Sequence, residues 1–220
     1  MSGAVRLAVV DYGAGNLVSI TQALETVGAS VTVARSPNEL QGVDGIVVPG
    51  VGASGPAMQR LRRRGLDLAI RDAVKAGTWY LGVCLGMQLL FDQSEEDGAR
   101  MLSLLPGIVV LIPDAPRMPH IGWNSIEIVR PHPLLDGLRD GAPAYFVHSY
   151  APQPTDGAVI VAETEHGGRF ASVIASGRLL CVQFHPERSG DDGLRILRNF
   201  VGLVAGAAAL VSNPALAGVA

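Results

Sequence analysis

The first half of this chain alternates short apolar runs with helical patterns. The apolar runs cover residues 5–10, 31–34, 45–48 and 79–83. Each run is hydrophobic throughout instead of at every second residue, so each predicts a strand that is buried on both faces. Between the runs, apolar residues recur at helical spacing, as at Ile20, Leu24 and Val27. This alternation predicts a parallel sheet with helices on both sides.

Two turn sequences mark where helices begin. Asn16 can cap a helix that stops at Gly28. The sequence SPNE at residues 36–39 has capping-box spacing with proline at the first helical position, so it predicts a short helix. The strand at 45–48 is expected to end in a glycine-rich loop at 49–53.

The second half of the chain has a different texture. Further strands are predicted at residues 108–112, 125–129, 145–150, 159–162, 170–175 and 179–184. They follow one another through turns rich in proline and glycine, which favours antiparallel additions to the same sheet. A last helix is expected from Asp191 to about Ala205. The fold class is therefore α/β, with a mostly parallel central sheet and an antiparallel extension.

The chain is expected to form one domain, residues 1–206, followed by an apolar, frayed tail at 207–220. Residues 201–220 carry no charge, and a segment of this length is nominally long enough to cross a bilayer. Three glycines and the break at Ser212-Asn213-Pro214 argue instead for a packed helix and a tail. We therefore expect no membrane span.

Composition narrows the class of protein. Hydrophobic residues make up 48% of the chain, and 17 Lys and Arg against 20 Asp and Glu give a net charge of -3. No overall positive field exists to hold nucleic acid or an anionic membrane. The arginines at 60 and 62–64 lack interleaved aromatic residues and indicate a solvated face or a partner surface. Without a signal-peptide pattern, two cysteines indicate free thiols in a reducing cytoplasm.

Cys84 lies where a reactive thiol is expected. The sequence GVCLG at residues 82–86 follows a predicted strand and precedes a helical run at 87–91. This is the pattern of a nucleophile elbow, in which small neighbours allow a sharp turn that lifts one side chain out of the sheet. A helix N-terminus stabilises the thiolate there. The competing interpretation is a small buried hydrophobic residue, which we favour for Cys181.

His185 and Glu187 complete a nucleophile, base and carboxylate set. In an extended segment, residues i and i+2 point to the same side, so Glu187 could fix the His185 tautomer. A zinc deaminase also uses His-x-Glu, but it requires a Pro-Cys-x-x-Cys motif that this chain lacks. No zinc motif and no complete dinucleotide-binding glycine pattern follow from the sequence, so we expect neither metal nor cofactor.

Backbone donors for a tetrahedral oxyanion are also available. The amide of Leu85 follows the nucleophile, and the loop containing Val51 and Gly52 ends a neighbouring predicted strand. The alternative for this loop is a plain turn between a strand and a helix.

These residues belong to motifs that resemble a known family, the glutaminase subunits of imidazole glycerol phosphate synthase. The motifs are DYGAGNL at 11–17, PGVGA at 49–53, GVCLGMQLLF at 82–91, PHIGWN at 119–124, YFVHSY at 145–150 and QFHPERSG at 183–190. The third and the last are shared by class I glutamine amidotransferases in general, whereas the first, fourth and fifth single out this family of subunits. The resemblance implies their three-layer, flavodoxin-like fold.

The resemblance further implies that Cys84, His185 and Glu187 hydrolyse L-glutamine, and that Gly52, Gln88, Ser149 and Tyr150 hold it. It also implies a heterodimer with a cyclase subunit that receives the ammonia, with Asn16 and Trp123 at the interface. A plain helix cap and a core aromatic residue are the alternatives for these two.

Three other functions remain alternatives. The first is another class I amidotransferase subunit, such as that of pyridoxal phosphate synthesis. The others are an inactive scaffolding relative and a cysteine hydrolase that acts alone. The intact triad argues against an inactive relative.

Overall fold

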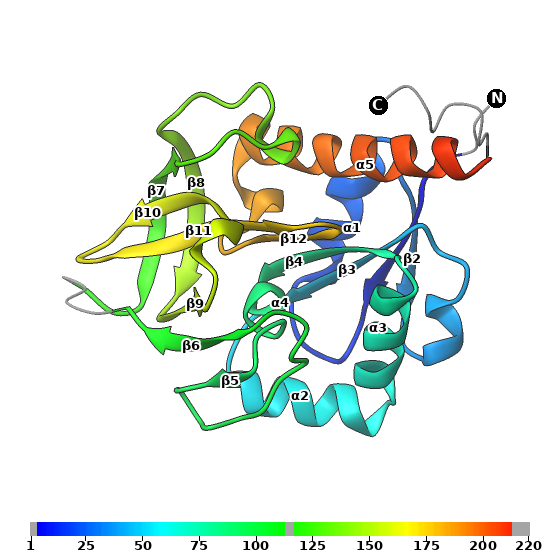
Figure 1. The fold of residues 1–220 in the computed structure, drawn as a ribbon, viewed down its shortest axis with the longest axis horizontal. Helices are drawn as coiled ribbons and strands as arrows, with labels where there is room; N and C mark the ends of the chain where they lie inside the picture. The colour runs from blue at the N-terminus through cyan, green and yellow to red at the C-terminus, as the bar shows by residue number, and fades with distance from the viewer. Residues whose placement is uncertain (1–3, 113–116, 213–220) are drawn as a thin grey trace.

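A nine-stranded sheet runs through the computed structural model, which describes residues 4–112 and 117–212 (Figure 1). In spatial order the strands are β2 (Ser30–Ala34), β1 (Arg6–Val10), β3 (Gly45–Gly50), β4 (Trp79–Cys84), β12 (Leu179–Val182), β11 (Arg169–Ser176), β10 (Ile160–Glu165), β7 (His120–Ile128) and β8 (Ala142–His148). The five strands from β2 to β12 are parallel, and the pairs from β12 to β8 are antiparallel. The predicted α/β class with an antiparallel extension is confirmed.

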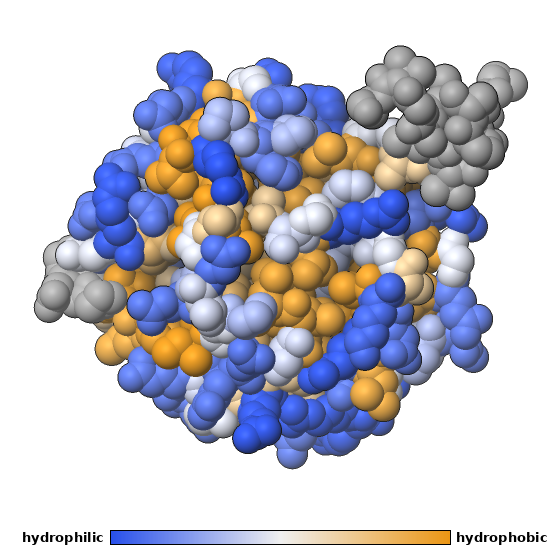
Figure 2. All heavy atoms as spheres, in the orientation of Figure 1, coloured by the Kyte–Doolittle hydropathy of each residue, from blue (hydrophilic) through white to orange (hydrophobic). Residues whose placement is uncertain are grey.

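Helices cover both faces of the parallel strands. On one face, α1 (Leu17–Thr26) and α5 (Gly190–Ser212) pack over an apolar core that includes Ile20, Leu24 and Phe200. On the other, α2 (Ser54–Arg63) and α3 (Leu66–Lys75) bury Met58 and Ile70 in a second core. Figure 2 shows apolar residues gathered in the middle of the molecule, between α5 and the polar outer surface of α2. The layers make the three-layer arrangement that the sequence predicts.

The helix starts follow the turn chemistry. Asn16 accepts a hydrogen bond from the Ser19 amide at 3.4 Å and so caps α1, which ends at Thr26. The capping box between Ser36 and Glu39 is present, although the helix it starts, η1 (Pro37–Leu40), is a single 3₁₀ turn. In the second half, η2 (Pro133–Leu135) and η3 (Gly157–Val159) are also short 3₁₀ turns.

Three expectations about the second half are wrong in detail. The predicted strand 145–150 is two strands, β8 and β9 (Tyr150–Pro154), because the chain leaves the main sheet at Ser149. The predicted strand 108–112 becomes β6 (Gly107–Leu111), which pairs with β5 (Gln93–Ser94) and β9 in a separate sheet. The strand predicted at 179–184 is parallel to β4 on one side. In each of the three cases, pairing between segments that are distant in the sequence determines where the strand lies and in which direction it pairs.

Two helices differ in length from the expectation. The helix after Cys84 is α4 (Leu85–Gln88), a single turn. The last helix continues past the expected end near Ala205 to Ser212, so the first residues of the predicted tail are helical. Residues 213–220 of that tail lie outside the described residues. Within the part of the chain that is described, no helix is long and apolar enough to span a membrane.

The arginine run on α2 anchors backbone segments. Arg60 donates to the Gly13 carbonyl at 3.0 Å, and Arg62 donates to the Arg100 carbonyl at 2.7 Å. Arg64 donates to the Asp11 carbonyl at 2.5 Å. The Arg60 and Arg64 contacts hold the loop between β1 and α1, and the Arg62 contact holds the segment between β5 and β6. Neither sequence interpretation of the run included this role.

Candidate active site

Cys84 forms a sharp turn between β4 and α4. Its φ of 53° is in the left-handed region, which is uncommon for a residue other than glycine. The turn depends on close backbone contacts at two glycines. A Cβ on Gly86 would lie 1.7 Å from the Val48 carbonyl oxygen, and one on Gly82 would lie 2.7 Å from the Gly86 oxygen. The strand, tight turn and helix predicted around Cys84 are therefore present, and only glycine fits on either side.

His185 and Glu187 lie directly after β12. The His185 Nδ1 atom is 2.8 Å from Glu187 Oε1, and the two side chains are 9% and 5% exposed. The segment after His185 is a 3₁₀ turn, η4 (Pro186–Arg188), and not the extended chain that the sequence analysis assumed. The contact survives because the tight turn also returns the carboxylate toward the ring. Ser189 fixes the turn by donating to the His185 carbonyl at 2.7 Å.

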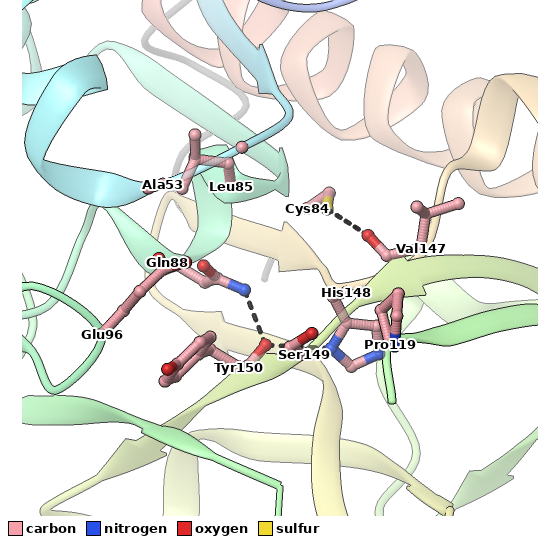
Figure 3. A pocket seen from close by; sticks show the side chains of 11 residues that line it. Ala53, Cys84, Leu85, Gln88, Glu96, Pro119, Val147, His148, Ser149 and Tyr150 are labelled. Atoms are coloured by element: carbon pink, nitrogen blue, oxygen red, sulfur yellow. Dashed lines mark hydrogen bonds between the residues drawn. The ribbon is translucent and has the colours of Figure 1, made fainter. Parts of the chain in front are cut away.

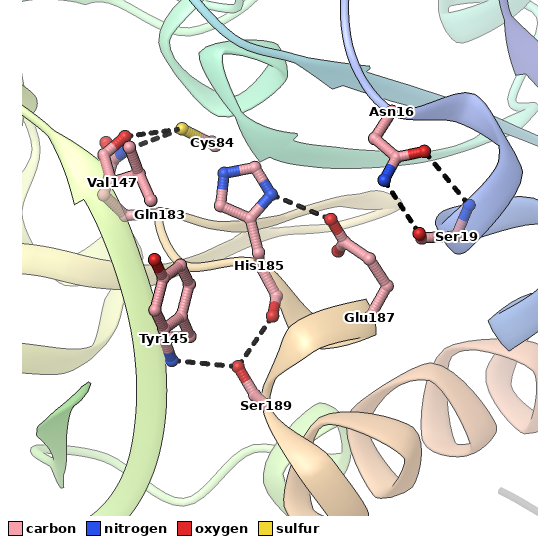
Figure 4. Close-up of polar contacts among 9 residues, drawn as sticks. All are labelled: Asn16, Ser19, Cys84, Tyr145, Val147, Gln183, His185, Glu187 and Ser189. Carbon is pink, nitrogen blue, oxygen red and sulfur yellow. Dashed lines mark hydrogen bonds and ion pairs between the residues drawn. The ribbon is translucent and has the colours of Figure 1, made fainter. Parts of the chain in front are cut away.

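Parallel pairing of β4 with β12 brings the thiol and the imidazole to the same edge of the sheet. Val182 lies opposite Val83, so the residues that follow both strands emerge side by side. Figure 4 shows the free ring nitrogen of His185 on the side nearer Cys84. This Nε2 atom is buried and has no hydrogen-bond partner among the described residues. An unpaired buried nitrogen is costly, and it marks a position where a proton acceptor or donor is needed.

The environment of His185 favours its protonated form. Burial opposes the charge, but the side chains of Cys84 and Glu187 outweigh it and raise the pKa of His185 to about 10. The second thiol behaves differently: burial raises the pKa of Cys181, which is fully enclosed in β12. Cys181 is thus part of the core, as predicted, and its thiol stays protonated at neutral pH.

A pocket of about 220 Å³ opens beside the thiol (Figure 3). It is lined by Gly52, Ala53, Cys84, Leu85, Gln88, Glu96, Pro119, Val147, His148, Ser149 and Tyr150. The four positions expected to hold a substrate are among these residues, together with Cys84. They come from two parts of the chain: the elbow with the β3 loop, and the segment joining β8 to β9.

The candidate oxyanion donors lie around the elbow. Gly50 is the register partner of Cys84 at the end of β3, so Val51 and Gly52 follow directly beside the nucleophile. Gly52 has a φ of 91°, a conformation that requires glycine or strains any other residue. Leu85 opens α4, which places its amide at the start of the helix. The role of these amides stays a prediction.

Asn16 and Trp123 lie outside the pocket lining. Asn16 caps α1, the structural role considered for it, and its amide also donates to Ser19 Oγ at 2.8 Å. Trp123 is 58% exposed, so the core interpretation of this residue is wrong. Its ring meets the Tyr145 ring at 6.0 Å, and the Arg188 guanidinium stacks on Tyr145 at 4.0 Å. An exposed aromatic and cationic cluster is typical of an interface.

Sequence reasoning missed several residues that shape the site. Glu96 and Pro119 line the pocket from distant loops, which only the folded chain reveals. His148 lies in the YFVHSY motif and also lines the pocket, although the sequence analysis gives it no role. Gln183 is fully buried, and its side-chain amide donates to Cys84 Sγ at 3.6 Å. A glutamine in a strand of otherwise apolar residues was the available signal. No group of metal-ligating side chains is found among residues 4–112 and 117–212.

Comparisons with known proteins agree with the resemblance that the sequence motifs carry. A family profile described as glutamine amidotransferase class-I matches residues 8–203. The imidazole glycerol phosphate synthase subunit HisH of Synechococcus sp. (strain JA-2-3B'a(2-13)) is 51% identical over 207 residues, which cover 92% of this chain and 95% of that protein. The subunit of the same name from Symbiobacterium thermophilum is 48% identical over 196 residues, which cover 89% and 92%.

Solved structures share the fold. One described as the structure of PurLQS from Thermotoga maritima has a TM-score of 0.75 at 18% identity and covers 92% of this chain and 100% of that one. A crystal structure of a glutamine amidotransferase has a TM-score of 0.72 at 22% identity and covers 90% and 98%. At these identities the likeness concerns the fold.

Proposed function

This chain belongs to the class I glutamine amidotransferases, in the family of the HisH subunits of imidazole glycerol phosphate synthase. From this premise, we propose how its residues release ammonia from glutamine. It is a glutamine-hydrolysing enzyme of histidine biosynthesis. The proposal concerns the residues that perform the reaction, the way glutamine is held, and the partner that receives the ammonia.

Cys84 is the nucleophile. Its thiolate attacks the side-chain amide carbon of glutamine, and the C–S bond forms as the carbonyl becomes an oxyanion. Protonated His185 then donates its Nε2 proton to the departing nitrogen, so that ammonia leaves and a thioester remains. The neutral imidazole next accepts a proton from water, which attacks the thioester and releases glutamate. Glu187 accepts from Nδ1 throughout and keeps Nε2 facing the reaction.

The pocket supplies complementary groups for the amino acid. Both donors of the Gln88 amide are engaged inside the protein, with the Tyr150 carbonyl and Gln183 Oε1. Its remaining Oε1 is therefore the atom available to accept from glutamine. Glu96 offers a carboxylate to the α-ammonium group. Ser149, Tyr150 and Gly52 border the rest of the amino acid, while the amides of Leu85, Val51 and Gly52 receive the oxyanion.

The partner is the cyclase subunit, bound as a heterodimer. Ammonia is useful only if it reaches its acceptor before it takes a proton from water. The cluster of exposed Trp123 and Arg188 around half-buried Tyr145 lies next to His185, since the His185 backbone N–H donates to the Tyr145 carbonyl. With Asn16 at the start of α1, it forms the surface proposed for the partner. The holoenzyme is then a lyase. A reducing cytoplasm suits its free thiol.

One observation carries the proposal: a buried imidazole, oriented by a carboxylate, turns its unpaired nitrogen toward a thiol at the edge of a pocket. The test is glutamate production from glutamine, measured with the chain alone and with the cyclase subunit and its ribonucleotide substrate. We expect the cyclase to raise the rate, and Cys84→Ala to reduce it by about a thousandfold or more.

Each part of the proposal has its own contradicting outcome. A Cys84→Ala variant that keeps its activity would exclude Cys84 as the nucleophile. An unchanged rate on adding the cyclase would exclude it as the partner. Calorimetric titration of Trp123→Ala with the cyclase tests the surface, because loss of the exposed indole should weaken binding.

A further inference from the structure

A chain of side-chain amides connects the pocket to the nucleophile. It begins at the Tyr150 carbonyl, passes through Gln88 and Gln183, and ends at Cys84 Sγ (Figure 4 shows its last contact). Gln183 is fully buried, which is rare for glutamine unless its polar atoms are satisfied. Neither amide is part of the triad.

The hydrogen bonds along this chain of amides fix the orientation of both side chains. A backbone carbonyl only accepts, so the Gln88 atom that lies 2.8 Å from the Tyr150 oxygen must be its nitrogen. The same nitrogen lies 3.1 Å from the Gln183 side chain, and its partner there must be the oxygen. The other end of the Gln183 amide, its NH₂ group, therefore faces Cys84 Sγ at 3.6 Å. A flipped Gln183 would set two donors against each other.

The thiol has opposing neighbours. In its protonated form, Cys84 donates to the Val147 carbonyl at 3.7 Å. The thiolate cannot donate, and a carbonyl oxygen next to it is unfavourable. The Gln183 donor is retained in both forms, and it becomes stronger when sulfur carries a charge. The Gln183 N–H therefore favours the thiolate of Cys84, whereas the Val147 carbonyl favours the protonated thiol.

We propose that Gln183 is a positioning residue for the nucleophile, whose side-chain N–H, held in orientation by Gln88, steadies Cys84 Sγ and favours its thiolate. This inference deepens the proposed function and rests on Cys84 being the nucleophile. Within residues 4–112 and 117–212, two titratable groups face the sulfur: His185 from the segment after β12, and Tyr12 from the loop after β1. Burial raises the pKa of Tyr12, so it stays neutral, and His185 is common to all variants below.

The test is the rate at which iodoacetamide alkylates Cys84 as a function of pH, with the modified peptide identified by mass spectrometry. Gln183→Met keeps the length of the side chain but removes the donor. We expect about a tenfold lower alkylation rate at neutral pH, and a pH profile of alkylation displaced to higher pH by about one unit. This displacement corresponds to the weakest hydrogen bonds that donors make to ionised groups. Gln183→Glu, which places an acceptor against the sulfur, should show a larger displacement.

Ser172→Ala is the matched control. Ser172 is also fully buried, and its carbonyl accepts from the backbone N–H of Gln183 at 2.9 Å, while its hydroxyl has no partner among the described residues. Its alkylation profile should match that of the unaltered protein. An unchanged profile in Gln183→Met, with a cooperative thermal transition retained, would overturn the inference. Alkylation needs no glutamine, so a failure of glutaminase activity in the unaltered chain is a separate result.

A second measurement covers the case in which the Gln183 variants do not fold. In the unaltered protein, the side-chain amide resonances of Gln183 should move as Cys84 ionises. The same resonances should not move over that pH range in Cys84→Ala. If the Gln183 side-chain amide resonances did not move as the Cys84 thiol ionises, the inference would also be overturned.

Discussion

The two halves of the main sheet bury different chemistry. The parallel strands β1 to β4 enclose apolar side chains, apart from Tyr80 and the thiol of Cys84. The antiparallel strands also enclose apolar side chains, such as Phe146 and Val173, but they bury polar ones beside them: His120, His148, Thr164 and Ser172. The parallel half thus presents its nucleophile through backbone geometry, and the antiparallel half shapes its side of the pocket through hydrogen bonds. Each half should therefore fail under a different perturbation.

The largest effect is expected from crowding the elbow of the parallel half. Gly86→Ala places a Cβ 1.7 Å from the Val48 oxygen, a contact that only a backbone shift relieves. We expect a loss of at least about 3 kcal/mol in the free energy of unfolding, together with loss of glutaminase activity. Urea denaturation and the glutamate assay measure the two.

Gly202→Ala is the control for this substitution. Gly202 lies within α5, and nothing described lies within 4 Å of a Cβ there. Alanine in a helix should stabilise the protein by roughly 0.5 to 1 kcal/mol. If Gly86→Ala behaved like Gly202→Ala, the elbow would not depend on backbone contact.

Acid should act on the antiparallel half. The Tyr150 carbonyl accepts from His148 Nδ1, so neutral His148 must accept at Nε2 from His120 Nδ1, 3.1 Å away. Burial lowers the pKa of His148 to about 3, and burial with His166 nearby lowers that of His120 to about 4. A second proton on His148 would set donor against donor across this contact, and a second proton on His120, at Nε2, would face the Asn124 side-chain N–H at 3.2 Å.

The sign of the pH effect follows from these values. The unfolded chain takes up protons below about pH 6.5, whereas the folded rings stay neutral, so stability falls as the pH drops from there toward 4. His148 alone should cost about 2 kcal/mol by pH 5. Hydrogen exchange should show β7 and β8 opening before β1 and β3. In His120→Phe/His148→Leu this part of the acid loss should vanish; an equally steep loss would locate its origin elsewhere.

The same contrast explains what the sequence could reveal. Strands of the parallel half were predicted to within two residues, because apolar runs and capping residues are local signals. The triad was also visible, since Cys84 and the His185–Glu187 pair each sit in a short motif. The second sheet, the break at Ser149 and the amide chain through Gln183 were not predicted. They depend on which distant strands pair, and local patterns carry no information about that.

The smallest effect is expected at Cys181, one strand away from the nucleophile. Both cysteines are buried, but Cys181 lies within β12, where its partner in the ladder, Gly82, precedes the elbow. Cys181→Ala should cost about 1 kcal/mol in stability, the value for one removed heavy atom and a small cavity. Its glutaminase rate should be unchanged, and iodoacetamide should label Cys84 only. Loss of activity at full stability would show that the chemistry extends along β12, and would remove the distinction between a turn that presents a thiol to the pocket and a strand that encloses one.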